Sequence, residues 1–238
     1  MTERIRQTEE FLRAKLTESP YFLKYPAKGE YRLEHSFRVA RIAGEIAKAE
    51  NMDEETAVIA GLLHDVSYCR EFEGHDDWMN HGRDAARIAR PFLEEMGLPS
   101  DTVEEIAYGI AIHVDGRSDF EGVRTPLALT VMDADNIDRF DVYRVYEMME
   151  HVGYGRLRAA EKRAYVCTVL ETLERYAKMA FATDAGTALW RERIAYYLVF
   201  YRKLLAQLDA GCGFMKTKSV TAPPPEGLER LLLLSGQF

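Results

Sequence analysis

The sequence predicts an all-α protein. Apolar residues recur at spacings of three and four along most of the chain, which is typical of helices that bury one face. The segments between these stretches carry Ser, Asp, Asn, Pro and Gly, the residues that begin and end helices. A chain of 238 residues with 47% hydrophobic content is also long enough to form a substantial core.

The first expected helix covers residues 2–17 and is closed by Ser19-Pro20. Residues 21–32 are rich in Tyr, Pro and Gly, so we expect a loop there. A helix over residues 34–50 should break at Asn51-Met52, and Asp53 should cap the next helix, over residues 54–66. Two helices joined by so tight a turn pack antiparallel. The start of one then lies beside the end of the other, which makes His35 and His64 neighbours.

A second helical hairpin repeats this arrangement. Residues 67–80 show no period and are expected to form a long loop near the site. Helices over residues 81–96 and 100–113 then flank Gly97-Leu98-Pro99. His81 opens the first of these helices and His113 closes the second, so their imidazoles should also share one end of the pair.

A fifth helix is predicted to begin at Thr125-Pro126, after a polar segment at residues 115–124. On this helix the spacing from Ala128 and Val131 points Asp135 at the buried face. We expect most other acids of the run 133–141 to be solvated. Two long helices, over residues 157–179 and 185–208, are expected to pack in the core or against a partner.

Composition limits the possible functions. The formal net charge of −8 and the pI near 5.4 argue against binding to a nucleic-acid polymer, which normally needs a basic face. Three distant cysteines suggest neither disulfides nor a Cys-x-x-Cys zinc site, which fits a reducing cytoplasm. Residues 1–20 lack the apolar stretch of a signal peptide, and no run approaches the ~18 apolar residues of a membrane span. We therefore expect a soluble cytoplasmic protein without a membrane partner.

Histidines and carboxylates gathered at helix ends would bind a divalent metal ion. Imidazole suits Zn, Fe, Mn, Ni or Co, and carboxylate widens the choice to Mg. Such an ion lowers the pKa of bound water and neutralises charge on a phosphoryl oxygen. The chemistry this predicts is hydrolysis of a phosphoester or phosphoanhydride.

The order of these residues resembles the HD-domain metal-dependent phosphohydrolase superfamily over roughly residues 30–145. The likeness lies in Glu34-His35-Ser36-Phe37-Arg38-Val39, in Ala60-Gly61-Leu62-Leu63-His64-Asp65 and in the distant Asp135. The run Asp133-Ala134-Asp135-Asn136-Ile137-Asp138 is similar to the Asp-Ala-Asp-Arg-Leu-Asp run of a bacterial subgroup that includes nucleoside triphosphate pyrophosphohydrolases. Asn136 departs from that run. Tyr68 stands where other branches carry Lys, and a Gly-Tyr-Pro continuation is missing.

The resemblance implies an HD-domain-like helical bundle with additional C-terminal helices. It implies roles for two sets of residues. The first metal would be held by His35, His64, Asp65 and Asp135. His81 and His113 would hold a second metal, contact substrate or act with Asp65 in catalysis; the alternative is that they only pack in the core. Arg38 and Arg139, each one turn from a ligand, would bind the substrate phosphate. His75 and His151 are expected in loops or on the surface.

The sequence thus favours a metal-dependent phosphohydrolase, with one or two ions, acting on a nucleotide or another small phosphorylated metabolite. The alternative is a non-catalytic metal-binding regulatory or protein-interaction module on the same scaffold. We expect an N-terminal helix and loop (1–29), a metal-binding core (30–150), C-terminal helices packing on the core (151–210) and a Pro-containing tail (211–238). The tail contains Pro223-Pro224-Pro225 and an apolar run at 231–234, and would dock on its own body or on a second subunit in a homodimer.

Overall fold

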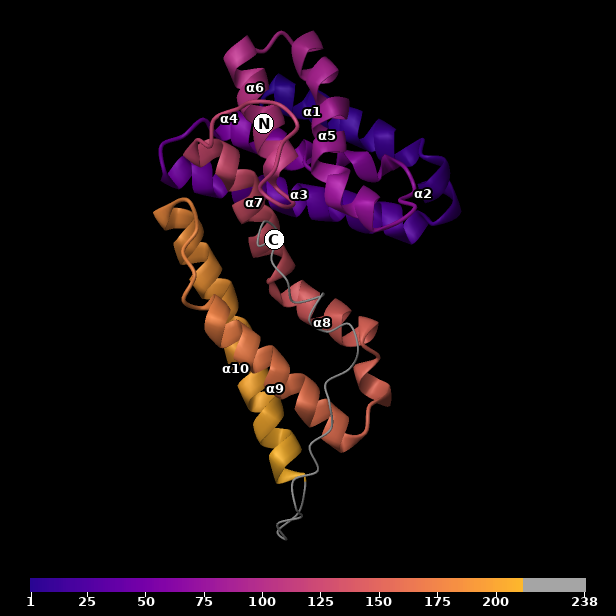
Figure 1. Ribbon diagram of the computed structural model, residues 1–238, viewed down its shortest axis with the longest axis vertical. Coiled ribbons are helices and arrows are strands. Elements are labelled where there is room, and N and C mark those ends of the chain that lie inside the picture. The colour runs from indigo at the N-terminus through magenta and orange to yellow at the C-terminus, as the bar shows by residue number, and fades with distance from the viewer. Residues whose placement is uncertain (212–238) are drawn as a thin grey trace. The chain divides into compact units, whose positions relative to one another are not determined.

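A computed structural model describes residues 1–211 and shows only helices, turns and loops among them (Figure 1). The predicted all-α class is therefore confirmed. The predicted Pro-containing tail and its apolar run lie outside the described residues. The helices are α1 (Glu3–Thr17), α2 (Pro20–Lys24), α3 (Pro26–Ala49), α4 (Glu54–Leu63), α5 (His75–Glu95), α6 (Ser100–Ile112), α7 (Pro126–Arg139), α8 (Val142–His151), α9 (Ala159–Tyr176) and α10 (Asp184–Ala210).

The chain forms two compact units. The first contains residues 1–138 and 181–186, and the second contains residues 139–180 and, within the described part of the chain, 187–211. The four-part division expected from the sequence stays a prediction. No helix described by the structure has both the length and the apolar character needed to cross a membrane.

Two segments expected to be loops are largely helical. Residues 21–32 contribute to α2 and α3, and α3 begins at Pro26. Proline at the first position of a helix is well tolerated, because its missing N–H would have no helical partner there. Helix α5 begins at His75 instead of His81, with Asp76 and Asp77 in its first turn, where negative charge favours the helix N-terminus.

Other helix boundaries follow the predicted capping residues. The carboxylate of Asp53 accepts the backbone N–H of Thr56 at 2.6 Å, which caps α4. The hydroxyl of Thr125 accepts the N–H of Ala128 at 3.0 Å at the start of α7. Each bond satisfies a donor that the first helical turn leaves without a partner.

Two helix pairs, α3 with α4 and α5 with α6, frame the first unit around a core that includes Leu12, Ile59, Leu62 and Ile106. Each pair approaches closely at a glycine. A Cβ at Gly61 would lie 2.6 Å from the Cα of Ala40, and one at Gly82 would lie 2.8 Å from the carbonyl oxygen of Ile110. The absence of a side chain at these positions lets the backbones meet. Both glycines lie within one turn of a histidine, so they bring the histidines of each pair close together.

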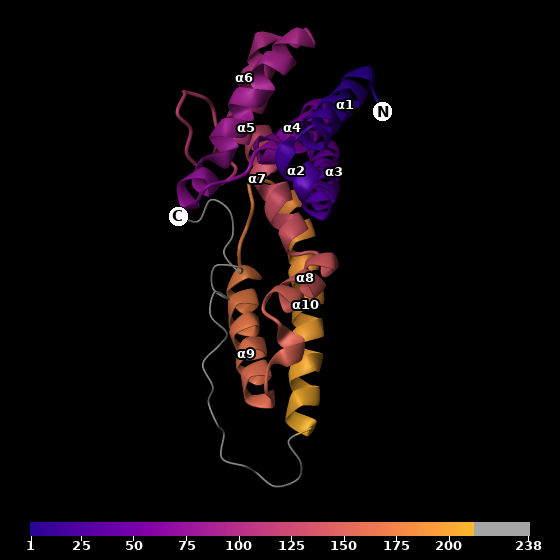
Figure 2. The same cartoon turned by 90° about the vertical axis from the view of Figure 1, so that its right-hand side faces the viewer.

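The second unit has an aromatic interior between α9 and α10, which lie side by side in Figure 2. The Tyr165 and Tyr201 hydroxyls are 3.2 Å apart, and the indole N–H of Trp190 donates to the carbonyl oxygen of Tyr176 at 2.8 Å. These contacts pair residues in antiparallel order. The two long helices expected from the sequence are thus present, whereas the sequence reasoning assigned no helix to α8.

Candidate metal centre

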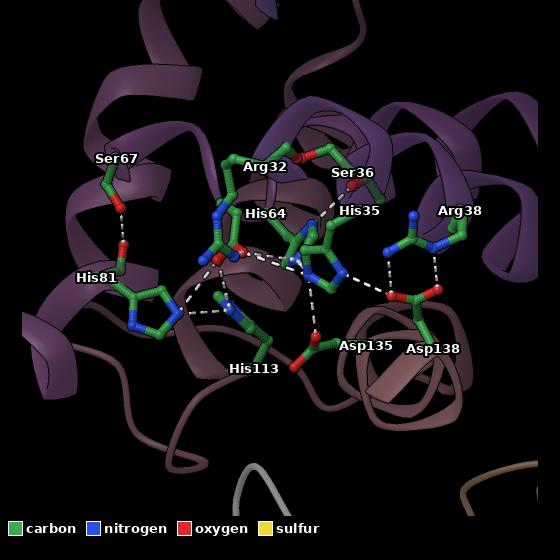
Figure 3. A network of polar contacts seen from close by, with 12 residues as sticks. Arg32, His35, Ser36, Arg38, His64, Ser67, His81, His113, Asp135 and Asp138 are labelled. Carbon is green, nitrogen blue, oxygen red and sulfur yellow. Dashed lines mark hydrogen bonds and ion pairs between the residues drawn. The ribbon is translucent and has the colours of Figure 1, made fainter. Parts of the chain in front are cut away.

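Six side chains from five segments of the first unit converge on one buried site (Figure 3). They are His35, His64, Asp65, His81, His113 and Asp135. His35 lies on α3, His64 and Asp65 directly follow α4, His81 lies on α5, His113 directly follows α6 and Asp135 lies on α7. The structure therefore brings together every metal-ligand candidate that the sequence predicted.

The first half of the site joins α3, α4 and α7. The Nε2 atom of His35 lies 3.2 Å from Nε2 of His64, 3.3 Å from Oδ1 of Asp135 and 3.4 Å from Oδ2 of Asp65. One ligand atom each from His35, His64 and Asp135 lies within 4.8 Å of the others, a spacing at which a single ion can contact all three.

The second half joins α5 and α6 to the other oxygen of Asp65. The Nε2 atoms of His81 and His113 are 3.1 Å apart, and they lie 3.2 Å and 3.6 Å from Asp65 Oδ1. Asp65 thus turns one carboxylate oxygen toward each histidine pair. Within the described residues Oδ1 is buried and has no hydrogen-bond partner, a costly state for a carboxylate oxygen.

All four imidazoles are oriented through their Nδ1 atoms. Nδ1 of His64 lies 2.7 Å from the carbonyl oxygen of Gly61, and Nδ1 of His113 lies 2.7 Å from that of Ile110. Nδ1 of His81 contacts the carbonyl oxygen of Trp78. Nδ1 of His35 lies 2.7 Å from a carboxylate oxygen of Asp138. Because these oxygens only accept, we assign a hydrogen to each Nδ1 atom, so that each imidazole directs Nε2 into the site.

This assignment creates a need for positive charge. A neutral imidazole with hydrogen on Nδ1 has a lone pair on Nε2, so each Nε2 pair sets two lone pairs about 3 Å apart. A proton or a metal ion between them removes the repulsion. Burial lowers the pKa of His35, but hydrogen bonds to Asp135, Asp138 and Asp65 outweigh it and raise the pKa to about 10. The site favours a cation, and the residues fit a divalent metal.

Arg32 is a site residue that the sequence reasoning missed. Its guanidinium donates to Asp65 Oδ2 and stacks on the Tyr68 ring at 3.6 Å from the centroid. Burial raises the pKa of the Asp65 carboxyl. The electrostatic attraction of His64 and Arg32 outweighs this effect and holds the pKa well below its ordinary value. Arg32 precedes His35 by three residues on α3, which puts both side chains on one helix face. That spacing was the signal available in the sequence.

Besides Asp135, two of the three other acids of the run 133–141 are buried, contrary to the expectation that most of these others are solvated. Asp138 accepts from His35 Nδ1 and from Arg38, whose Nε lies 2.7 Å from its carboxylate. Asp133 accepts the backbone N–H of Ala182 at 2.9 Å, and burial raises its pKa to about 7. Asp135 and Asp138 are three residues apart on α7 and share the face that points toward α3. Asp133 points toward residues 181–186 instead.

The other candidates lie as follows. Arg38 is paired with Asp138, so its role in binding substrate stays a prediction. Arg139 is half-buried at the start of the second unit, and its role also stays a prediction. His75 and His151 are exposed, as expected, although both lie in helices.

A comparison with known protein families matches the part of the chain that contains the metal centre. A family model described as the HD domain matches residues 32–139, the span that supplies all six side chains of the metal centre. Residues 32–139 of the chain therefore belong to the HD-domain superfamily. This match supports the resemblance to a superfamily of metal-dependent hydrolases, and the His and Asp cluster fits a divalent metal ion of the kind that HD domains bind.

The chain is also similar to a solved structure and to curated relatives. The fold is similar to that of a predicted HD superfamily hydrolase from an uncultured Thermotogales bacterium, with a TM-score of 0.55 and 21% identity, over 83% of this chain and 91% of that one. Ribonuclease Y of Thermus thermophilus is 32% identical over 160 residues, 66% of this chain. Ribonuclease Y of Mycoplasma mycoides is 39% identical over 67 residues, 28% of this chain. The chain spans only 24% and 15% of those two relatives.

Proposed function

We propose that this HD-domain protein is a metal-dependent phosphohydrolase that cleaves a phosphoester or phosphoanhydride of a nucleotide or another small phosphorylated metabolite. The observation that carries the proposal is the convergence of four Nε2 atoms on the two oxygens of Asp65, one of which lacks a hydrogen bond. Structural histidines in a core would instead pair each ring nitrogen with a protein partner.

The residues fit two cation positions. His35, His64, Asp135 and Asp65 Oδ2 would hold the first cation, and His81, His113 and Asp65 Oδ1 would hold the second. Divalent ions held there supply a nucleophile at neutral pH and neutralise charge on a phosphoryl oxygen. Asp65 would contribute one oxygen to each position, as its orientation toward both histidine pairs allows.

The chain's own groups would then position the substrate. The carbonyl and carboxylate contacts at Nδ1 hold the four rings in place, so that none of the four imidazoles has to be ordered during the reaction. Arg32 carries a fixed positive charge at the site, and its planar donors match a phosphate group. We propose that Arg32 binds the substrate phosphate once a cation has taken its place at Asp65.

A substrate screen tests the proposal. Purified protein is assayed with Mn, Mg, Co, Ni, Fe and Zn in turn against p-nitrophenyl phosphate, nucleoside mono- and triphosphates and a short RNA. The RNA is included because the curated relatives are named ribonucleases. We expect metal-dependent hydrolysis that Asp65→Ala abolishes and Asp76→Ala retains, since Asp76 follows His75 in the sequence as Asp65 follows His64 but is exposed.

Two results would overturn the proposal. Full activity of Asp65→Ala would contradict the role of the bridging carboxylate. Bound metal without turnover on any substrate of the panel would instead favour the non-catalytic metal-binding module.

A further inference from the structure

Three aromatic rings surround His81 at the edge of the metal centre. The ring centroids of Tyr68, Phe72 and Trp78 lie 5.2, 6.1 and 6.2 Å from that of His81. His81 and Asp135 have the most exposed side chains of the centre, at 8% and 9%, whereas His64 is fully buried. The three rings therefore lie beside one of the two most exposed side chains of the centre.

Trp78 is the exposed member of the set. Its exposed fraction is 37%, while Trp190, the other tryptophan of the chain, is fully buried. Trp78 lies one turn before His81 on α5, and its carbonyl oxygen accepts from Nδ1 of His81. The His75 ring stacks beside the indole at 5.9 Å, with 24° between the ring planes. The backbone of Trp78 thus orients the metal-ligand candidate His81, while the indole side chain of Trp78 stays exposed.

The segment that carries Phe72 is tied to the same helix. Arg70 pairs with Asp77 and Asp84 of α5, and its guanidinium lies 5.3 Å from the Phe72 centroid. The carboxylate of Asp77 also accepts the backbone N–H of Glu73 at 2.8 Å. These contacts order the rings before any ligand binds, so binding to them has a smaller entropic cost.

We propose that Trp78 and Phe72 bind the base of a nucleotide while its phosphate enters the metal centre past His81. The phosphate part of this inference rests on the proposed function. A ring face presents no net charge, so the group that it selects is flat and weakly polar, and every nucleobase has such a face. The same chemistry is offered by a free mononucleotide and by the terminal residue of an RNA strand.

Binding of paired probes tests this assignment. AMP and ribose 5-phosphate carry the same phosphate and differ in the base, and Mg²⁺ is present throughout. AMP is expected to change the fluorescence of Trp78, whereas ribose 5-phosphate leaves it unchanged. Stacking on an aromatic side chain contributes roughly 1–3 kcal/mol per base. Trp78→Ala should therefore weaken AMP binding by about 5- to 150-fold without altering the affinity for ribose 5-phosphate.

Two further variants complete the test. Trp78→Phe keeps a ring and should restore most of the AMP affinity, whereas Tyr146→Ala removes an exposed ring of the second unit and should change nothing. Equal losses for both probes in Trp78→Ala, or no loss, would overturn the inference. Base-dependent binding without any turnover would overturn the proposed function alone. A larger Trp78→Ala effect on a short RNA than on AMP would identify an RNA terminus as the source of the base.

Discussion

Replacing Arg32 with Met should tighten metal binding, because Arg32 and a cation compete for the same oxygen of Asp65. Methionine keeps an aliphatic contact with the Tyr68 ring but removes the charge. A hydrogen bond between charged groups contributes about 1.5–3 kcal/mol, and about 1.4 kcal/mol changes an affinity tenfold. With the guanidinium absent, the metal no longer has to displace it. We expect the dissociation constant for Zn²⁺ to fall by about 10- to 100-fold in isothermal titration calorimetry.

The same substitution should destabilise the protein when metal is removed. Breaking a buried ion pair costs about 3–5 kcal/mol, and the 17% exposure of the Arg32 side chain favours the lower end. For a unit of this size about 3 kcal/mol corresponds to a fall in melting temperature of about 6–12 °C. Differential scanning calorimetry in EDTA measures this fall, and added Zn²⁺ should reverse most of it.

Arg38→Met is the matched control. Arg38 lies on the same helix, but it pairs with Asp138, which does not face the cation positions. Arg38→Met exposes no oxygen of a metal-ligand candidate, and it removes a contact that holds Asp138 against His35. The metal affinity of this variant should therefore be equal to or lower than that of the wild type. An Arg32→Met protein that binds Zn²⁺ no more tightly than the wild type would refute the competition.

Three other predictions follow from the site. Asp65→Asn should abolish turnover while Asp133→Asn, another buried carboxylate, retains it in a p-nitrophenyl phosphate assay; equal losses would point to a fold defect. In EDTA the folded pKa of His35, about 10, exceeds its ordinary 6.5, so its proton stabilises the fold below pH 6.5 and this contribution is lost as pH rises toward 10. The melting temperature should fall over that range, and less so in His35→Gln. Gly61→Ala should overpack the backbones of α3 and α4 at a cost of about 1–3 kcal/mol, whereas Gly155→Ala, with open space around it, should not alter the urea midpoint.

The pairing of histidines followed from the sequence because it needs only helix direction and turn length. His35 and His64 had to meet once their helices formed a hairpin, and the same holds for His81 and His113. The inward phase of Asp135 also followed from a spacing of three and four. These predictions depend on local periodicity, which a single sequence records directly.

The missed features depend on contacts between distant segments. Nothing in the apolar pattern shows that Asp138 meets His35 and Arg38 across two helices, or that Asp133 accepts from residue 182. The burial of these acids was therefore not predicted. Helix starts at Pro26 and His75 were missed because proline and mixed polar residues were interpreted as loop signals, although both suit a first helical turn.

Crystals of the protein soaked with Zn²⁺ or Mn²⁺ would test the central claim most directly. Anomalous diffraction locates each ion independently of the protein coordinates. We expect one ion bound by His35, His64, Asp65 and Asp135, and a second bound by Asp65, His81 and His113. A metal-loaded crystal in which no ion contacts Asp65, or in which the ions bind elsewhere on the chain, would contradict the account.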